Sequence, residues 1–119
     1  RTLTLKEILT AGSTPFSSDD EKLITEAYAF AEKAHREQKR RSGEPYITHC
    51  LAVGLTLREI GMDARTIAAG LLHDVPEDTE VTLTEIEKKF GSEIAYLVDG
   101  ITKLGKIKLR GTKEELYLE

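Results

Sequence analysis

The most informative stretch of this sequence is Leu71-Leu72-His73-Asp74-Val75-Pro76-Glu77-Asp78-Thr79. Two leucines run directly into a histidine and an aspartate, and two more acids follow three and four positions after Asp74. Residues at these spacings share one face of a helix, so three carboxylates would crowd together if the helix continued. Crowded carboxylates repel one another, and a bound cation is the simplest relief. The stretch therefore predicts a metal site at the end of a helix.

His73 and Asp74 lie about 100° apart around a helix, so both can reach one ion at its end. An imidazole with a carboxylate suits Mn, Fe, Zn or another first-row divalent ion better than Ca. A third ligand must come from elsewhere, and His49, near the start of an earlier expected helix, is the natural candidate.

A plainer interpretation of the same residues stays open. His73 equally fits a last-turn histidine that interacts with the helix dipole, with Asp74 and Asp78 as solvated loop acids. Taken singly, His35 and His49 are more typical of packed or surface histidines than of metal ligands.

The composition limits the classes of function. A chain of 119 residues makes one domain, and its formal net charge of −4 argues against a DNA-binding protein. Apolar runs are only a few residues long and no leader pattern is present, which predicts a cytoplasmic protein without a membrane span. The single cysteine, Cys50, fits a reducing compartment.

Helical patterns cover nearly the whole chain, and no strand pair is indicated, so we expect an all-α domain. Residues 64–73 contain the small residues Ala64, Ala68, Ala69 and Gly70, which allow a close approach of helices. Gly105 to Gly111 is expected to be a basic linker. The expected helices begin at caps or first-turn residues, which are Thr4, Ser18 (running to about Gln38), Pro45 (to about Ile60), Asp63, Thr82 and Ser92.

A basic loop precedes the helix that carries His49. Arginine forks match phosphate oxygens, and their planes stack on bases, so Arg40 and Arg41 are candidates for nucleotide binding. The alternative is a solvated basic loop. Because Ser42 to Tyr46 connect the loop directly to His49, a phosphate held by the arginines would lie near the metal.

Three motifs occur in the order found in one family. They are Arg40-Arg41-Ser42-Gly43-Glu44-Pro45-Tyr46-Ile47-Thr48-His49, Ala69-Gly70-Leu71-Leu72-His73-Asp74 with Glu77-Asp78-Thr79, and Phe90-Gly91 with Val98-Asp99-Gly100-Ile101-Thr102-Lys103-Leu104. This pattern closely resembles the N-terminal hydrolase domain of RelA/SpoT-homologue (p)ppGpp synthetase/hydrolases. The resemblance implies an HD-domain helical bundle, with residues 1–18 as a short helix and connector and residues 19–119 as a partial HD domain.

The resemblance also implies a reaction and a role for each matching residue. The reaction is Mn²⁺-dependent removal of the 3′-pyrophosphate of (p)ppGpp, which gives GDP or GTP and pyrophosphate. The matching residues would serve as metal ligands (His49, His73 and Asp74), as the acidic pair that activates water (Glu77 and Asp78) and as the nucleotide pocket (Arg40, Arg41, Ser42 and Tyr46). Synthetase-only members lack the acidic and metal-binding pairs, so the intact pairs favour a hydrolase.

This sequence departs from the family pattern at three points. Pro76 stands where an aliphatic residue is usual, so we expect the helix to end at Asp74 and the acids to lie on a turn. Cys50 replaces a common proline, and we expect it to pack as a small apolar group. The family's fourth metal ligand, a later aspartate, has no counterpart before Glu119.

The ends of the sequence suggest a longer natural protein. The chain begins with Arg1, and Thr112-Lys113-Glu114-Glu115 would open a helix of only about two turns. We therefore expect the bundle to be incomplete at its C-terminus and to self-associate through exposed apolar surface. On its own this piece should bind metal weakly, if at all, and should hydrolyse little, which calorimetric titration with Mn²⁺ would test. The longer protein could also carry a GTP pyrophosphokinase domain.

Two other functions remain open. One is an HD phosphohydrolase acting on another nucleotide. The other is a catalytically silent HD domain that binds the alarmone or a partner and regulates.

Overall fold

The computed structural model describes residues 3–12, 14–36, 43 and 45–111, the last seven of these by their backbone alone. Within these residues the chain forms seven helices and no strand, which confirms the all-α prediction. In chain order the helices are α1 (Leu5–Thr10), α2 (Ser18–Ala34), α3 (Tyr46–Glu59), α4 (Ala64–Leu72), α5 (Val75–Asp78), α6 (Leu83–Phe90) and α7 (Ser92–Gly111). None of the described helices combines the length and apolarity needed to cross a membrane.

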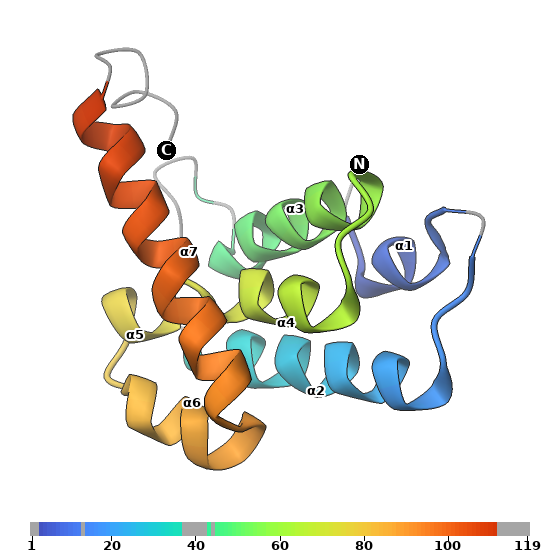
Figure 1. Cartoon of the computed structure of the whole chain (residues 1–119), viewed down its shortest axis with the longest axis horizontal. Helices are drawn as coiled ribbons and strands as arrows, with labels where there is room; N and C mark the ends of the chain where they lie inside the picture. The colour runs from blue at the N-terminus through green and yellow to red at the C-terminus, as the bar shows by residue number, and fades with distance from the viewer. Residues whose placement is uncertain (1–2, 13, 37–42, 44, 112–119) are drawn as a thin grey trace.

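The central element is α4, which packs against α2, α3 and α7 (Figure 1). Seven of its residues are buried, namely Ala64, Ile67, Ala68, Ala69, Gly70, Leu71 and Leu72. Only Arg65 of α4 is exposed, and a helix that is apolar over most of its surface must be enclosed by protein, which its neighbours supply. The residues that follow Leu72 therefore leave the helix inside the bundle rather than at its surface.

Glycines bring α3 and α4 unusually close together. A Cβ placed on Gly70 would lie 2.4 Å from Leu57 Cδ1, and one on Gly54 would lie 3.0 Å from both Ile8 Cδ1 and Leu71 Cδ2. Real Cβ atoms essentially never approach as closely as at Gly70, and the contacts at Gly54 are tighter than most, so a side chain at either position would press on its neighbours. The prediction of close helix approach at residues 64–73 is thus confirmed, and it brings the end of α4 beside α3.

Two helices begin at the N-cap residues that the sequence predicted, and one begins a residue earlier. Asp63 caps α4 by accepting a hydrogen bond from Thr66 N, as expected, and Thr82 forms a complete capping box with Glu85. The cap of α2, however, is Ser17, whose side chain accepts from Asp20 N, and the prediction of Ser18 was one residue late.

The other differences concern helix ends. The Thr4 side chain makes no capping hydrogen bond, so the capping box expected there is not formed. Helix α2 ends at Ala34, short of the expected Gln38. The stretch expected to be a linker, Gly105 to Gly111, continues α7, because a single glycine lowers helix stability by only about 1 kcal/mol. The predicted capping box at 112–115 lies outside the described residues.

Pro76 begins a helix instead of merely ending one. Helix α4 stops at Leu72, and Pro76 lies in the first turn of the short helix α5. Proline is tolerated in a first turn because the N–H it lacks has no partner within the helix there. The turn expected after Asp74 is therefore one turn of helix, in which Asp78 N donates to Asp74 O at 2.9 Å.

Arg58 fastens the N-terminal connector onto α3. Its guanidinium donates to Ala11 O at 2.9 Å and to Thr14 O at 2.6 Å, and it lies 3.8 Å from the centre of the Phe16 ring. Helix α1 joins the same core, since Ile8 is fully buried. Residues 1–18 were expected as a short helix and connector, and their apolar side chains Leu3, Leu5, Leu9 and Phe16 pack against the core.

We predict that Arg58→Met lowers the free energy of unfolding by about 1–3 kcal/mol, because two charge-assisted hydrogen bonds are lost. Arg36→Met is the matched control. Its guanidinium bonds Glu32 on an exposed face of α2, an interaction worth about 0.3–0.5 kcal/mol. Urea unfolding would measure both losses, and limited proteolysis should cut the Arg58 variant faster between residues 11 and 16. Equal losses in the two variants would contradict the prediction.

Candidate metal centre

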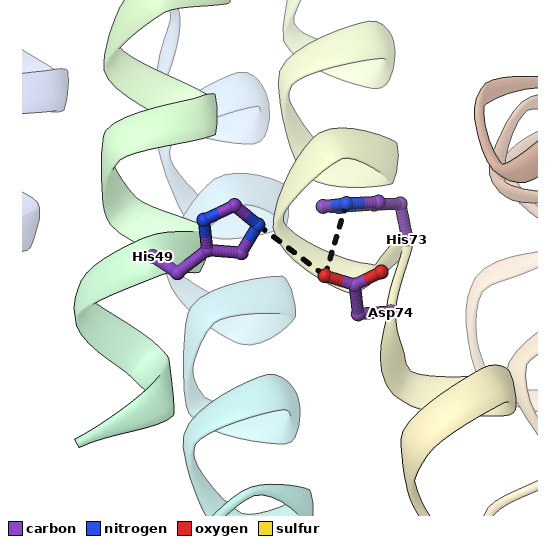
Figure 2. Close-up of side chains that lie close together, drawn as sticks. All are labelled: His49, His73 and Asp74. Carbon is purple, nitrogen blue, oxygen red and sulfur yellow. Dashed lines mark ion pairs between the residues drawn. The ribbon is translucent and has the colours of Figure 1, made fainter. Parts of the chain in front are cut away.

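Three side chains from two neighbouring helices converge where α4 ends. His49 comes from the first turn of α3, while His73 and Asp74 form the junction between α4 and α5 (Figure 2). Their ligand atoms all lie within 4.8 Å of one another, and they form a candidate metal site within the described residues. The sequence proposed these three residues as ligands, and the structure brings them together.

The focus of the cluster is one carboxylate oxygen, Asp74 Oδ2. It lies 3.1 Å from His73 Nε2 and 3.4 Å from His49 Nε2. Two ligand atoms on one first-row ion, each about 2.1 Å from it, are separated by roughly 3.0–3.4 Å in tetrahedral or octahedral geometry. The distances from Asp74 Oδ2 to the two histidine nitrogens therefore suit a single ion.

The orientation of His73 also suits a metal ligand. Its Nδ1 lies 2.6 Å from Gly70 O, so in the neutral ring Nδ1 carries the hydrogen and Nε2 presents its lone pair. Two lone-pair atoms, Nε2 and Asp74 Oδ2, then face each other and need a proton or a cation between them. A ring nitrogen fixed on a backbone carbonyl is the usual support of a metal-binding histidine. The donor set thus fits a divalent cation.

Asp74 stays ionised in this environment. Burial raises the pKa of its carboxyl, but hydrogen bonds from His49 and His73 outweigh burial and hold that pKa well below its usual range. For His73, burial lowers the pKa, yet the hydrogen bond and charge of Asp74 leave it above its ordinary value. A permanently anionic oxygen beside two imidazoles is what a divalent cation requires.

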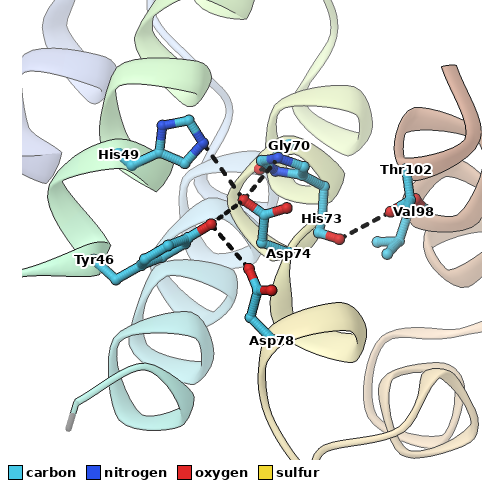
Figure 3. Close-up of polar contacts among 8 residues, drawn as sticks. All are labelled: Tyr46, His49, Gly70, His73, Asp74, Asp78, Val98 and Thr102. Atoms are coloured by element: carbon cyan, nitrogen blue, oxygen red, sulfur yellow. Dashed lines mark hydrogen bonds and ion pairs between the residues drawn. The ribbon is translucent and has the colours of Figure 1, made fainter. Parts of the chain in front are cut away.

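Tyr46 links Asp74 to the next acid along the chain. Its hydroxyl lies 2.8 Å from Asp74 Oδ2 and 2.9 Å from Asp78 Oδ2 (Figure 3). Burial, followed by the hydrogen bond to Asp74, raises the pKa of Tyr46 far above its ordinary value, so the hydroxyl remains a donor. The prediction that Asp74 and Asp78 share a helix face agrees with this arrangement, because one hydroxyl reaches both.

The acids of α5 are not part of the candidate metal site. Glu77 and Asp78 are both exposed, and neither belongs to the group of three whose ligand atoms are mutually close. Arg40, Arg41 and Ser42 lie outside the described residues.

Some features of the site were missed from the sequence. Thr102 of α7 donates to His73 O, with 2.9 Å between Oγ1 and that carbonyl oxygen, and so ties a distant helix to the junction. Buried His35 stacks on Tyr46. The only sequence signal for Tyr46 as a partner of the metal site was its position three residues before His49, which places both on one face of α3.

Cys50 takes no visible part in the cluster. It is fully buried, and burial, with the nearby charges of Asp74 and Asp78, raises its pKa to about 12. Its thiol therefore packs as a small apolar group, as expected.

Comparison with known proteins gives the family. The profile of the HD domain matches residues 27–115, and such domains bind divalent metal ions, in agreement with the His–Asp cluster. The chain is 54% identical over 94 residues to the guanosine-3′,5′-bis(diphosphate) 3′-pyrophosphohydrolase of Aquifex aeolicus, covering 79% of this chain and 14% of that protein. It is 49% identical over 96 residues to the bifunctional (p)ppGpp synthase/hydrolase SpoT of Escherichia coli, covering 81% and 14%.

A third relative is named for another activity. The GTP pyrophosphokinase of Streptomyces coelicolor is 56% identical over 85 residues, which is 71% of this chain and 10% of that protein. The chain thus spans only a small part of the length of these relatives. Because the profile covers most of its residues, the chain belongs to the HD domain family.

Proposed function

We propose that the full-length protein that carries this domain hydrolyses the 3′-pyrophosphate of (p)ppGpp, with Mn²⁺ as cofactor, to give GDP or GTP and pyrophosphate. The observation that carries the proposal is the convergence of His49, His73 and Asp74, with Asp78 attached to the same cluster through Tyr46. The names of the hydrolase relatives support the choice of substrate.

In this proposal His49 Nε2, His73 Nε2 and Asp74 would hold the metal. When bound, a divalent ion lowers the pKa of a coordinated water and polarises a phosphoryl oxygen. Asp78 accepts the proton of the attacking water, which requires a reach of about 3 Å. We choose Asp78 over Glu77 for this step because its carboxylate already lies on the Tyr46 hydroxyl. Glu77, which is exposed on α5 as Asp78 is, would relay the proton to solvent.

The nucleotide is assigned to the loop before α3. We propose that Arg40 stacks on the guanine and that Arg41 and Ser42 contact phosphate oxygens, since planar guanidinium groups suit both partners. The loop leads into Tyr46, the first residue of α3, so its end is anchored beside the metal site. We further propose a cytoplasmic location, where guanine nucleotides are available. Self-association also remains a prediction, which light scattering would test.

The test is an assay of the full-length protein that carries this sequence. We expect release of pyrophosphate from ppGpp with Mn²⁺, and none after chelation. Deoxynucleoside triphosphates and cyclic nucleotides should not be turned over. Turnover of one of these without turnover of ppGpp would instead indicate a phosphohydrolase for another nucleotide. Binding of ppGpp with no turnover at all would indicate a regulatory domain.

A further inference from the structure

The ring of Tyr46 is held between two histidines. It stacks on His35 with ring centres 4.6 Å apart and planes inclined by 26°, and it meets His49 edge-on at 5.6 Å and 71°. His35 is 1% exposed and follows the last residue of α2, where its backbone N–H donates to Ala31 O. Two helix termini, the end of α2 and the start of α3, therefore fix where the phenol ring lies.

The hydroxyl of that ring is engaged by two carboxylates. Both Asp74 Oδ2 and Asp78 Oδ2 lie within hydrogen-bond distance, as Figure 3 shows, and a phenol has a single hydrogen to donate. The two acids share that hydrogen, and the shared contact sets the spacing between them. A phosphate oxygen, itself an acceptor, would have to compete with two carboxylates for the same hydrogen.

From these contacts we infer that His35 and Tyr46 are a positioning pair, in which His35 holds the phenol ring and the Tyr46 hydroxyl fixes Asp78 relative to Asp74. This inference rests on the proposed function, which makes Asp74 a metal ligand and Asp78 the acceptor of a proton. This role of Tyr46 differs from the one that the family resemblance implies, which is to line the nucleotide pocket. The two roles predict different measurements, because positioning acts on metal affinity and on turnover, whereas pocket lining acts on substrate affinity.

Tyr46→Phe separates them, because it removes the hydroxyl and keeps the stacked ring. In the full-length protein we expect Mn²⁺ affinity, measured by electron paramagnetic resonance without nucleotide, to fall about 10–100-fold, as for other supports of metal ligands. We expect kcat to fall while KM for ppGpp stays within about twofold. Tyr96→Phe, at a tyrosine 78% exposed on α7, is the matched control and should change neither quantity. A higher KM with unchanged Mn²⁺ affinity would overturn the inference.

His35 is tested by two variants, because removal of a buried ring can unfold the protein. His35→Phe keeps an aromatic stack and should hold Mn²⁺ affinity within about threefold, whereas His35→Ala should lower it as Tyr46→Phe does. Thermal melts report whether each variant is folded. Equal losses in folded His35→Phe and His35→Ala would show that the stack is not what matters, and so would wild-type affinity in both.

Failure of the proposed function would look different. If the protein binds Mn²⁺ but does not turn over ppGpp, while Tyr46→Phe still weakens Mn²⁺ binding, the positioning pair stands and the assigned substrate is wrong. If the wild-type protein binds no Mn²⁺, both fall together.

Discussion

Asp74→Asn is expected to lower the Mn²⁺ affinity of the full-length protein by at least about 100-fold and its hydrolysis of ppGpp by about 1,000-fold. The first figure follows because even residues that only support a ligand cost 10–100-fold when replaced. The second follows because metal activation of water supplies several kcal/mol, and each 1.36 kcal/mol is a tenfold change in rate. Both effects have one origin, the loss of an anionic oxygen on which two histidines converge.

The substitution is close to isosteric, which makes it a sharp test. Asparagine keeps the shape of the side chain, so Tyr46 can still donate to its amide oxygen, but the negative charge is gone. Without that charge the cluster offers two imidazoles and a neutral amide, a poor set for a hard divalent ion. Calorimetric titration with Mn²⁺ and a pyrophosphate-release assay would measure the two effects separately.

Asp99→Asn is the matched control for this change. Asp99 lies on α7, and its carboxylate pairs with Lys103 on a solvent-exposed face, 2.9 Å from Nζ. Such exposed pairs contribute little, so we expect this variant to bind Mn²⁺ and to turn over ppGpp like the wild type. Unchanged turnover in Asp74→Asn would contradict the hydrolase proposal and would favour a catalytically silent domain.

The candidate ligands were predictable from the sequence for two reasons. Two of them are neighbours in the chain, and small residues indicate which helices pack closely together. The pair His73-Asp74 is adjacent in the chain. The small residue Gly70 indicates that α4 lies close to another helix. That close approach is what brings His49 beside the pair. The order of the motifs then favoured these three residues over other histidines and acids.

The support of the site could not be predicted, because it depends on where helices end in space. His35 stacks on Tyr46 just after α2 ends at Ala34, whereas the helix expected from the sequence ran about one turn further. The contact between Thr102 and His73 O depends on how α7 crosses the end of α4. Long-range contacts of this kind leave no periodic signal in a single sequence.

Ile67→Ala should lower the free energy of unfolding by about 2–5 kcal/mol, the usual cost of removing a large aliphatic side chain from a core. Ile67 is fully buried in α4, the helix enclosed by α2, α3 and α7. The loss is large against the total stability of a small domain, which is about 5–15 kcal/mol. Urea unfolding followed by circular dichroism would show a lower midpoint with an unchanged slope.

Ile60→Ala removes the same atoms from a residue that is 62% exposed just beyond α3, and we expect a change within about 0.5 kcal/mol. If the two variants lost the same stability, α4 would not be the centre of the core. His73 and Asp74 at its end would then not be held by a rigid helix, as the metal site requires. A large difference between them would instead tie the stability of the bundle to the helix that presents the ligands. In the full-length protein, addition of Mn²⁺ should then raise the midpoint of Ile67→Ala, because an ion that binds only the folded state stabilises it.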